Sequence, residues 1–428
     1  MSKWPASLPD YRWPDQQLSR GYAPQRWALA FIFHLSYLAG RLIGAWSKGP
    51  GSLLVIRTDG IGDAILFEPA LRSLAEAFAG LPIQLWAPAP TCELFAAHPA
   101  VVRTQPVPRG AKAGNIEYFA SIHWRAFLGW RLGRQQFLAA FYAVESPEPL
   151  GNWLLSSVRA AEKWYAPGDT ENQFIWQRTR TATAATKFLF PREAAGHELL
   201  RNAHLGEQWG GAVSLVPQLY IEEHARLAAQ STAGQWRDMA AKARTVEMVG
   251  IMAGSATGVN AYPIESWATV IRSLWHSRRV MCILFGGPGD AARNDKITSL
   301  LGDIPHLRLS PETGLLTIAV LLVELDGFIS MDTGLAHIAL VQNVPTVVLA
   351  NGGHPNRFFP WPTARWSITL AHRMPCEGCL CRCVLAEPEC VTRIHPEDVV
   401  AAYASIVAER KGEAFAKVRS TRGRIAAA

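Results

Sequence analysis

Several signatures that would point directly to a function are missing from this 428-residue sequence. No strand-like run leads into a Gly-x-Gly-x-x-Gly turn with an acidic residue about twenty positions later, which argues against a dinucleotide-dependent oxidoreductase. No Asp-x-Asp pair of the kind that holds a catalytic divalent cation lies in a suitable loop. Zinc-finger, basic-helix and aromatic-basic RNA-binding patterns are also missing, so nucleic acid is not an expected partner, despite a formal net charge of +7.

Targeting signals are equally sparse. The first twenty residues contain no short apolar core followed by a small-residue cleavage site, so we expect a cytoplasmic location. The apolar stretch within Arg26–Lys48 is short for a membrane-spanning helix and is interrupted by Arg41. Two interpretations of this N-terminal helical extension, residues 1–50, remain open. A helix packed on the protein's own core is slightly favoured over a helix lying on the inner membrane surface.

The chain is long enough for two globular units of roughly 150–200 residues each. The first is expected over residues 51–235. Its opening pattern predicts a buried strand at Leu53–Ile56, a loop at Asp59–Asp63 and a helix at Ile65–Phe78, and the run PIQLWAP predicts a second strand. Residues 115–210 read mostly as helices with irregular connections.

A second unit is expected over residues 236–400, followed by a C-terminal helix and basic tail at 401–428. Residues 225–245 read as a linker or domain-joining helix. Four apolar runs, each ending in small or polar residues, alternate with segments of helical length and predict a second doubly wound parallel sheet. They lie within residues 246–258, 280–290, 327–340 and 346–353. Ligands of such sheets bind at the carboxyl ends of the strands, so the residues after each run are candidate site residues.

The turn after the first strand, Arg57–Asp63, contains two glycines and two aspartates. Gly60 and Gly62 permit tight backbone geometry and the close approach of a ligand. Asp63 falls near a helix N-terminus, where the helix dipole favours the ionised carboxylate and keeps it available as a base. Simple helix capping by Asp63 is the alternative.

A second turn, Ser330–His337, follows another strand and opens a helix. Backbone N–H groups at such a helix start bind phosphate well. The alternative is that Thr333 and Gly334 only cap the helix and that His337 is a buried histidine with a structural role.

These two segments carry a family resemblance. RTDGIGDAILFEPALRSL resembles the first motif of glycosyltransferase family 9, the lipopolysaccharide heptosyltransferases, and Asp332-Thr333-Gly334-x-x-His337 is similar to that family's diphosphate-binding motif. The resemblance implies an α/β fold of the GT-B type, in which two Rossmann-like domains face each other across a cleft. The acceptor would bind the N-terminal half and the nucleotide sugar the C-terminal half.

The same resemblance implies roles for individual residues. Asp63 would be the catalytic base on the acceptor hydroxyl, and Asp59 would support it within an acceptor-side loop. Asp332, Thr333 and Gly334 would hold the diphosphate through their backbone, with the Asp332 side chain reaching the sugar and His337 close by. The acceptor-side loop comprises Arg57, Asp59, Gly60 and Gly62.

Two further blocks resemble the family's donor site. FGGPGDAARN resembles a Gly-rich turn whose acid, here Asp290, holds ribose hydroxyls. GSATGVNAYPIESW resembles a phosphate-binding block, in which Ser255 and Thr257 would be donors. The family's Lys is missing there, because Asn260 stands at its place. A neutral amide cannot offset phosphate charge, so we expect helix-start amides and a cation from elsewhere, such as Arg357, to stabilise the leaving diphosphate.

We therefore expect an inverting, metal-independent glycosyltransferase with no catalytic cofactor. It would move a heptose-like sugar from an ADP-heptose-type donor to a saccharide, lipid-linked or protein acceptor, as in lipopolysaccharide biosynthesis. The alternative is a non-catalytic sugar-nucleotide or polysaccharide-binding protein of the same fold, which the missing Lys would favour. Peripheral membrane contact and a homo-oligomer remain open.

Five of the seven cysteines fall between residues 376 and 390, a density that cytoplasmic proteins rarely use for disulfides. Cys376, Cys379, Cys383 and Cys390 can form a four-sulfur structural site for zinc or iron, with Cys381 as a spare or a substitute ligand. A set of free or redox-active thiols is the alternative. A comparable Cys-rich segment with bound iron occurs in the autotransporter heptosyltransferases, which this region resembles.

Overall fold

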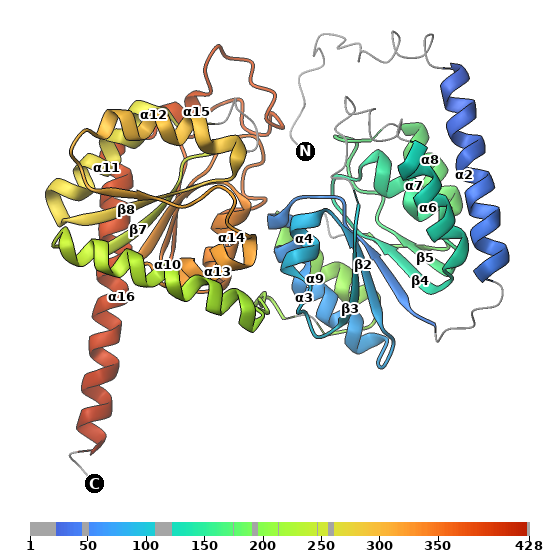
Figure 1. Cartoon of the computed structure of the whole chain (residues 1–428), viewed down its shortest axis with the longest axis horizontal. Helices are drawn as coiled ribbons and strands as arrows, with labels where there is room; N and C mark the ends of the chain where they lie inside the picture. Colours follow the sequence, from blue (N-terminus) through green and yellow to red (C-terminus); the bar gives the residue numbers. More distant parts are fainter. Residues whose placement is uncertain are drawn as a thin grey trace.

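The chain folds into two α/β halves that lie side by side (Figure 1). The computed structural model describes residues 23–44, 51–107, 122–173, 175–190, 196–212, 214–245, 247–255 and 261–425. Each half is built on one six-stranded parallel sheet with helices packed on its faces.

The sheet of the first half has the strand order β3-β2-β1-β4-β5-β6. This is the doubly wound order of a Rossmann fold, with its switch point between β1 and β4. The strands are β1 (Leu53–Ile56), β2 (Ile83–Ala87), β3 (Val101–Pro106), β4 (Phe137–Tyr142), β5 (Ala160–Tyr165) and β6 (Lys187–Phe188). The helices of this half are α2 (Ala23–Gly44), α3 (Ile61–Ala77), α4 (Ala89–Leu94), α6 (Ile122–Arg134), α7 (Pro149–Ser157), α8 (Ile175–Ala184) and α9 (Glu198–Gln208).

The sheet of the second half, β12-β11-β10-β7-β8-β9, repeats the same order, with the switch point between β7 and β10. Its strands are β7 (Glu247–Met252), β8 (Val280–Phe285), β9 (His306–Arg308), β10 (Gly327–Met331), β11 (Thr346–Leu349) and β12 (Ser367–Leu370). The surrounding helices are α10 (Glu223–Lys242), α11 (Ile264–Arg278), η2 (Pro288–Asp290), α12 (Ala291–Leu301), α13 (Leu315–Val323), α14 (Gly334–Val341), α15 (Glu389–Thr392) and α16 (Pro396–Ile425).

The predicted architecture is confirmed, since both halves are parallel, doubly wound and adjacent. The first two predicted strands and all four predicted apolar runs of the second half form strands. The largest apolar cluster extends through both halves, from Leu53 in β1 to Val348 in β11, so the halves share packed surface. Our boundary between residues 235 and 236 falls inside α10, which packs on α13 of the second half.

The prediction for residues 115–210 is wrong in one respect, because the described part of this segment contributes three strands as well as four helices. The strand β4, FLAAFY, is buried at five of its six positions and shows no polar alternation. A short Ala-containing apolar run of this kind cannot be told from a buried helix by periodicity.

The N-terminal extension packs as α2 along α6. The two backbones approach closely at glycines: a Cβ placed on Gly40 would lie 2.2 Å from the Trp130 carbonyl oxygen, and one on Gly133 would lie 2.0 Å from that of Tyr37. The packed-helix interpretation is therefore confirmed for the face of α2 that meets α6. Within the described ranges, no helix combines the length and apolar composition needed to cross a bilayer.

Candidate active site between the two halves

The first motif lies at the carboxyl end of β1, beside the switch point of the first sheet. Helix α3 begins at Ile61, so Gly62 and Asp63 belong to its first turn rather than to the loop we expected. The N-cap residue Gly60 donates its N–H to Asp63 Oδ2 over 3.3 Å. Asp63 thus does cap the helix, as the alternative interpretation required, but only with one oxygen.

The second motif lies at the carboxyl end of β10, beside the switch point of the second sheet. Thr333 is the N-cap of α14, and its side chain makes no capping hydrogen bond. Instead, the Thr333 hydroxyl pairs with that of Ser330 at 3.0 Å. The amides that begin α14 are therefore not capped by this side chain, as anion binding at a helix start requires.

The two motifs touch each other across the junction of the halves. A Cβ on Gly62 would lie 2.6 Å from Cδ2 of His337, and one on Gly334 would lie 3.0 Å from Cβ of Ile61. Only glycine permits this approach of α3 to α14 without displacement of a neighbour. In this structure the space beside Gly62 is filled by the His337 ring.

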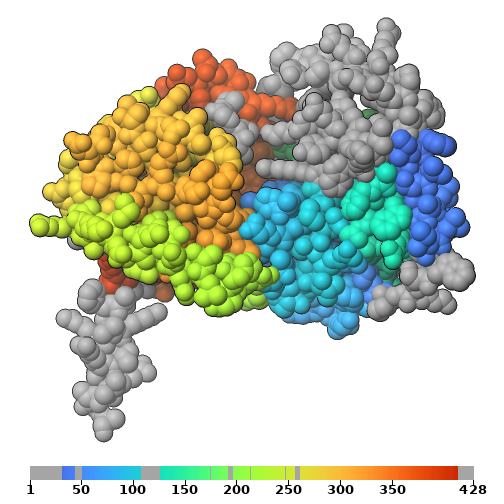
Figure 2. Space-filling model, viewed as in Figure 1, coloured from blue at the N-terminus to red at the C-terminus, as the bar shows by residue number. Residues whose placement is uncertain are grey.

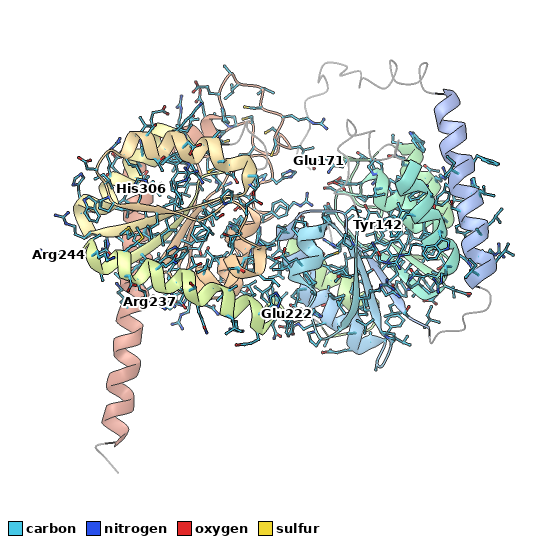
Figure 3. The ribbon with its side chains drawn as sticks, in the orientation of Figure 1. Tyr142, Glu171, Glu222, Arg237, Arg244 and His306 are labelled. Carbon is cyan, nitrogen blue, oxygen red and sulfur yellow. The ribbon has the colours of Figure 1, made fainter. Side chains whose placement is uncertain are left out.

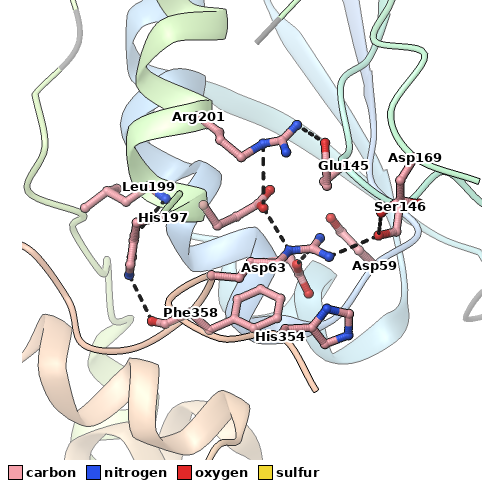
Figure 4. Close-up of polar contacts among 12 residues, drawn as sticks. Asp59, Asp63, Glu145, Ser146, Asp169, His197, Leu199, Arg201, His354 and Phe358 are labelled. Carbon is pink, nitrogen blue, oxygen red and sulfur yellow. Dashed lines mark hydrogen bonds and ion pairs between the residues drawn. The ribbon is translucent and has the colours of Figure 1, made fainter. Parts of the chain in front are cut away.

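Arg357, in the segment after β11, connects the second half to the first. Figure 4 shows His354 and Phe358 of the same segment beside Asp63. Its Nε donates to Glu198 Oε2 at 3.1 Å and its Nη1 to Ser146 Oγ at 3.1 Å, while its Nη2 lies 3.9 Å from Asp63 Oδ1. Burial by itself would lower the pKa of Arg357, but the carboxylates of Glu198 and Asp63 outweigh it and raise the pKa. The guanidinium is thus a fixed positive charge beside the candidate base.

Glu198 begins α9 and is almost completely buried. Burial raises the pKa of its carboxyl, and the Arg357 charge opposes that shift. Its backbone N–H also donates to the Arg357 carbonyl at 2.8 Å, and the neighbouring His197 Nε2 pairs with the Phe358 carbonyl at 3.0 Å. The start of α9 is therefore hydrogen-bonded to residues 357 and 358 of the other half.

Sequence reasoning missed Glu198, because it lies in the segment that we read only as helices. The one available signal was the pair His197-Glu198 just before an apolar helical pattern, which is where a helix cap is expected. Nothing in that pattern indicates a partner 159 positions away.

A second contact across the junction joins His354 Nε2 to Glu171 Oε1 at 3.7 Å. Figure 3 places Glu171 at the inner edge of the first half, facing the second. Together with Arg357 it shows that the segment after β11 docks onto the first half through polar side chains.

Arg57 and Asp59 shape the first turn. Arg57 is buried, donates to the Ala143 carbonyl at 2.7 Å and forms an ion pair with Asp59. Burial raises the pKa of Asp59 to about 7, because it outweighs the favourable charge of Arg57. The Arg57–Asp59 pair is satisfied within the turn, and Arg57 Nη2 also donates to the Asp63 carbonyl oxygen at 3.5 Å.

Asp332 is partly exposed and faces the same charge cluster. Burial and, to a smaller extent, the negative charge of Asp63 together raise its pKa to about 7, against the opposing charge of Arg357. Asp63, Asp332, Glu198 and Arg357 therefore influence one another across the junction. A carboxyl with this pKa is protonated in a large fraction of molecules at neutral pH and can then donate a hydrogen bond.

His337 is buried and neutral at physiological pH, since burial lowers its pKa to about 3. Its Nδ1 accepts a 3.0 Å hydrogen bond from Trp361 Nε1. The ring lies next to the first turn of α3 and packs the two motifs together. This is the buried, structural role that the alternative interpretation gave to His337.

The remaining donor-side candidates lie at the same edge of the second sheet. Asp290 Oδ2 accepts the Gly287 N–H at 2.9 Å, and a Cβ on Gly254 would lie 1.9 Å from Asp290 Oδ1. The turns after β7 and β8 therefore meet at Asp290, next to Ser255. Thr257 and Asn260 lie outside the described residues.

The cysteines gather in one place after β12. Cys376, Cys379, Cys383 and Cys390 line one small pocket, together with Gly352 and Gly353. Cys381 is not part of the lining, in keeping with a spare thiol, and its Sγ lies near Asn351 Oδ1 at 3.7 Å. In the ranges that the structure describes, no three His, Cys, Asp or Glu side chains are arranged to hold a metal ion.

Two facing Rossmann-like halves with signature turns meeting at their junction define a GT-B-type protein. The family model of glycosyltransferase family 9 (heptosyltransferase) matches residues 178–384. The chain is 23% identical over 376 residues to lipopolysaccharide heptosyltransferase 1 of Pseudomonas aeruginosa, which covers 81% of this chain and 95% of that protein. The family resemblance is thereby confirmed, and the chain is a glycosyltransferase related to family 9.

Solved structures share the fold. A glycosyl transferase family 9 protein from Veillonella parvula matches with a TM-score of 0.65 at 17% identity, covering 84% of this chain and 98% of that one. The ADP-heptose LPS heptosyltransferase II of E. coli matches with a TM-score of 0.62 at 17% identity, covering 84% and 99%.

Proposed function

We propose that this glycosyltransferase moves a heptose-like sugar from a nucleotide diphosphate donor of the ADP-heptose type, with inversion at the anomeric carbon. The observation that carries the proposal is the meeting of Asp63 with the Asp332–Gly334 turn at the junction of the halves. A base on one half and a phosphate-binding helix start on the other are what in-line displacement needs.

In the proposed reaction, Asp63 accepts the proton of the acceptor hydroxyl as the oxygen attacks the anomeric carbon. The bond to the diphosphate breaks on the opposite face, so a single displacement inverts the configuration. Arg357 and the amides that begin α14 take up the negative charge of the departing diphosphate. Arg357 thereby replaces the family Lys whose place Asn260 takes.

The donor would lie along the carboxyl ends of β7, β8 and β10. Asp290 is proposed for the ribose hydroxyls, Ser255 and Thr257 for the phosphates, and Asp332 for the sugar. A protonated Asp332 can donate to the sugar or phosphate without charge repulsion, which fits its pKa of about 7.

The acceptor is proposed to be a saccharide of the lipopolysaccharide core, free of or attached to its lipid. The names of the Pseudomonas relative and of the E. coli neighbour support this choice, since both are called lipopolysaccharide heptosyltransferases. The turn from Arg57 to Gly62 would face it. A protein acceptor and a cytoplasmic location remain predictions.

Nucleotide diphosphate release from ADP-, GDP- and UDP-sugars, measured for the wild type and Asp63→Ala, tests the proposal. We expect turnover with one nucleotide class and a loss of about 10²–10⁴-fold in the variant, the usual contribution of a general base. Full transfer by Asp63→Ala would remove Asp63 from this role. Turnover by the wild type would also exclude the non-catalytic alternative, and the anomeric configuration of the product by NMR tests inversion.

Metal independence is a separate expectation, tested by the same assay with EDTA. The rate should stay at the wild-type value after the protein has been freed of divalent cations. Restoration of a lost rate by Mg²⁺ or Mn²⁺ would contradict a metal-independent mechanism.

The cysteine pocket is proposed to hold a structural zinc or iron ion. The donor chemistry fits, because four thiols line one pocket and thiolates select these metals. The arrangement does not fit as it stands, since no three of these groups converge on a common point within the described residues. Elemental analysis of protein purified without chelator should give about one metal per chain, and a value far below one would favour free thiols.

A further inference from the structure

Helix α2 has two faces of opposite character. Its inner face packs on α6 through Phe33, Tyr37 and Gly40. Its outer face presents Phe31, Leu35, Leu38 and Leu42, whose side chains are between 54% and 72% exposed.

The outer residues form one continuous stripe. Their spacing of four, three and four residues places all of them within roughly 60° of arc, because successive residues turn by roughly 100° around a helix. The stripe lies opposite Gly40, so it points away from α6. Figures 1 and 2 show α2 at the edge of the first half that faces away from the second half.

The stripe is held rigidly. Glycines on both helices bring the backbones of α2 and α6 into contact, and Phe33 stacks edge-on against Trp153 at 4.9 Å. The helix therefore cannot rotate its apolar side inward without losing this packing.

The layer formed by α2 and α6 is also strongly basic. Its two sequences contain five arginines, two in α2 and three in α6, and no aspartate or glutamate. Burial and the positive charges of Arg103 and Arg134 lower the pKa of Arg131, so the three arginines lie near one another. Arg41 and Arg134 are exposed.

We propose that the outer stripe of α2 docks the protein on an anionic membrane surface. The four apolar side chains would enter the boundary between headgroups and acyl chains while the surrounding arginines meet lipid phosphates. An apolar stripe on a pair of helices whose sequences contain arginines and no acidic residue has the composition that interfacial helices use.

A second copy of the chain fits the stripe less well. Stable protein interfaces use roughly 20–30 residues a side, whereas the stripe offers four. Two copies meeting there would also bring like-charged arginines together, whereas anionic lipid offsets them. The inference does not depend on the identity of the transferred sugar.

Flotation of the full-length chain with vesicles tests the proposal. We expect binding to vesicles of phosphatidylglycerol and phosphatidylethanolamine, little binding to phosphatidylcholine alone, and weaker binding in high salt. The double variant Leu35→Glu/Leu42→Glu should reduce binding about tenfold or more, because charge is placed where the stripe must enter lipid. Glu is a good helix former, so α2 should stay folded.

Leu227→Glu is the matched control, because Leu227 on α10 is 57% exposed but lies in the second half. It should float like the wild type. Equal flotation of the double variant and wild type would overturn the proposal, as would a wild type that stays with the unbound fraction. A wild-type dimer in analytical ultracentrifugation that the double variant breaks, without flotation, would assign the stripe to self-association instead.

Discussion

Nη2 of Arg357 in the second half lies 3.9 Å from Oδ1 of Asp63 in the first half. The same guanidinium is bound more closely to Glu198, with Nε 3.1 Å from Oε2. Arg357 therefore has one firm carboxylate partner and one loose one. A diphosphate arriving at the α14 helix start can replace the loose partner, which would release Asp63 to act as the base.

Arg357→Ala should impair the departure of the diphosphate. Loss of one charge-stabilising donor at a reacting centre costs about 10²–10³-fold in kcat. The measurement is steady-state nucleotide release with donor saturating and acceptor varied. Arg357→Lys keeps the charge but not the planar donor geometry, so it should recover only part of the rate. A kcat unchanged in Arg357→Ala would exclude the residue from leaving-group stabilisation.

Glu198 is expected to act through Arg357 rather than on the substrate. Glu198→Gln removes the charge that anchors the guanidinium, and should lower kcat/KM by about tenfold or more. If Glu198 only positions Arg357, the double variant with Arg357→Ala should be no slower than Arg357→Ala alone. Multiplying losses would show that Glu198 has a separate role. Circular dichroism should accompany the kinetics, because breaking a buried pair also destabilises the protein by about 3 kcal/mol.

Much of the fold was readable from sequence, because parallel strands buried on both faces leave plain apolar runs. Leu53–Ile56 and the four runs of the second half are of this kind. The strand β4 was not readable, since its two alanines and short length fit a buried helix equally well. Only its pairing with β1 and β5 decides the matter.

The parts of the candidate site that lie within one short stretch of sequence could be predicted. Asp63 and the Asp332–Gly334 turn each follow a strand directly, so their position at a sheet edge could be predicted. The contact between Glu198 and Arg357 could not be predicted, because it depends on how the two halves pack against each other. The same holds for Gly62, whose neighbour His337 lies in the other half.

The raised pKa of Asp332 predicts a pH-dependent stability. Between pH 4 and 7 the folded chain keeps a proton on Asp332 that the unfolded chain releases, so the free energy of unfolding should fall as pH rises through this window. Asp332→Asn should make the fall smaller, by about 1–2 kcal/mol once partial exposure is allowed for. Asp59, whose pKa is also raised to about 7, should leave part of the fall in place. Urea unfolding at pH 4.5 and 7.5 measures the difference, and an identical fall in both proteins would contradict it.

Gly62→Ala tests whether contact between the two motifs is needed for activity. The new methyl group would meet the His337 ring at 2.6 Å, so either α3 or α14 must shift. We expect a loss of stability of about 1–3 kcal/mol, as for overpacking elsewhere, and a lower kcat, because Asp63 moves with α3. Gly234→Ala on α10 is the control, since a Cβ there meets nothing within 4 Å and should stabilise the helix by up to about 1 kcal/mol.

Had Gly62 served only to admit a ligand, the Gly62→Ala substitution would raise KM and leave the free energy of unfolding unchanged. Measured together, kcat, KM and the urea midpoint therefore separate a contact between helices from a contact with substrate.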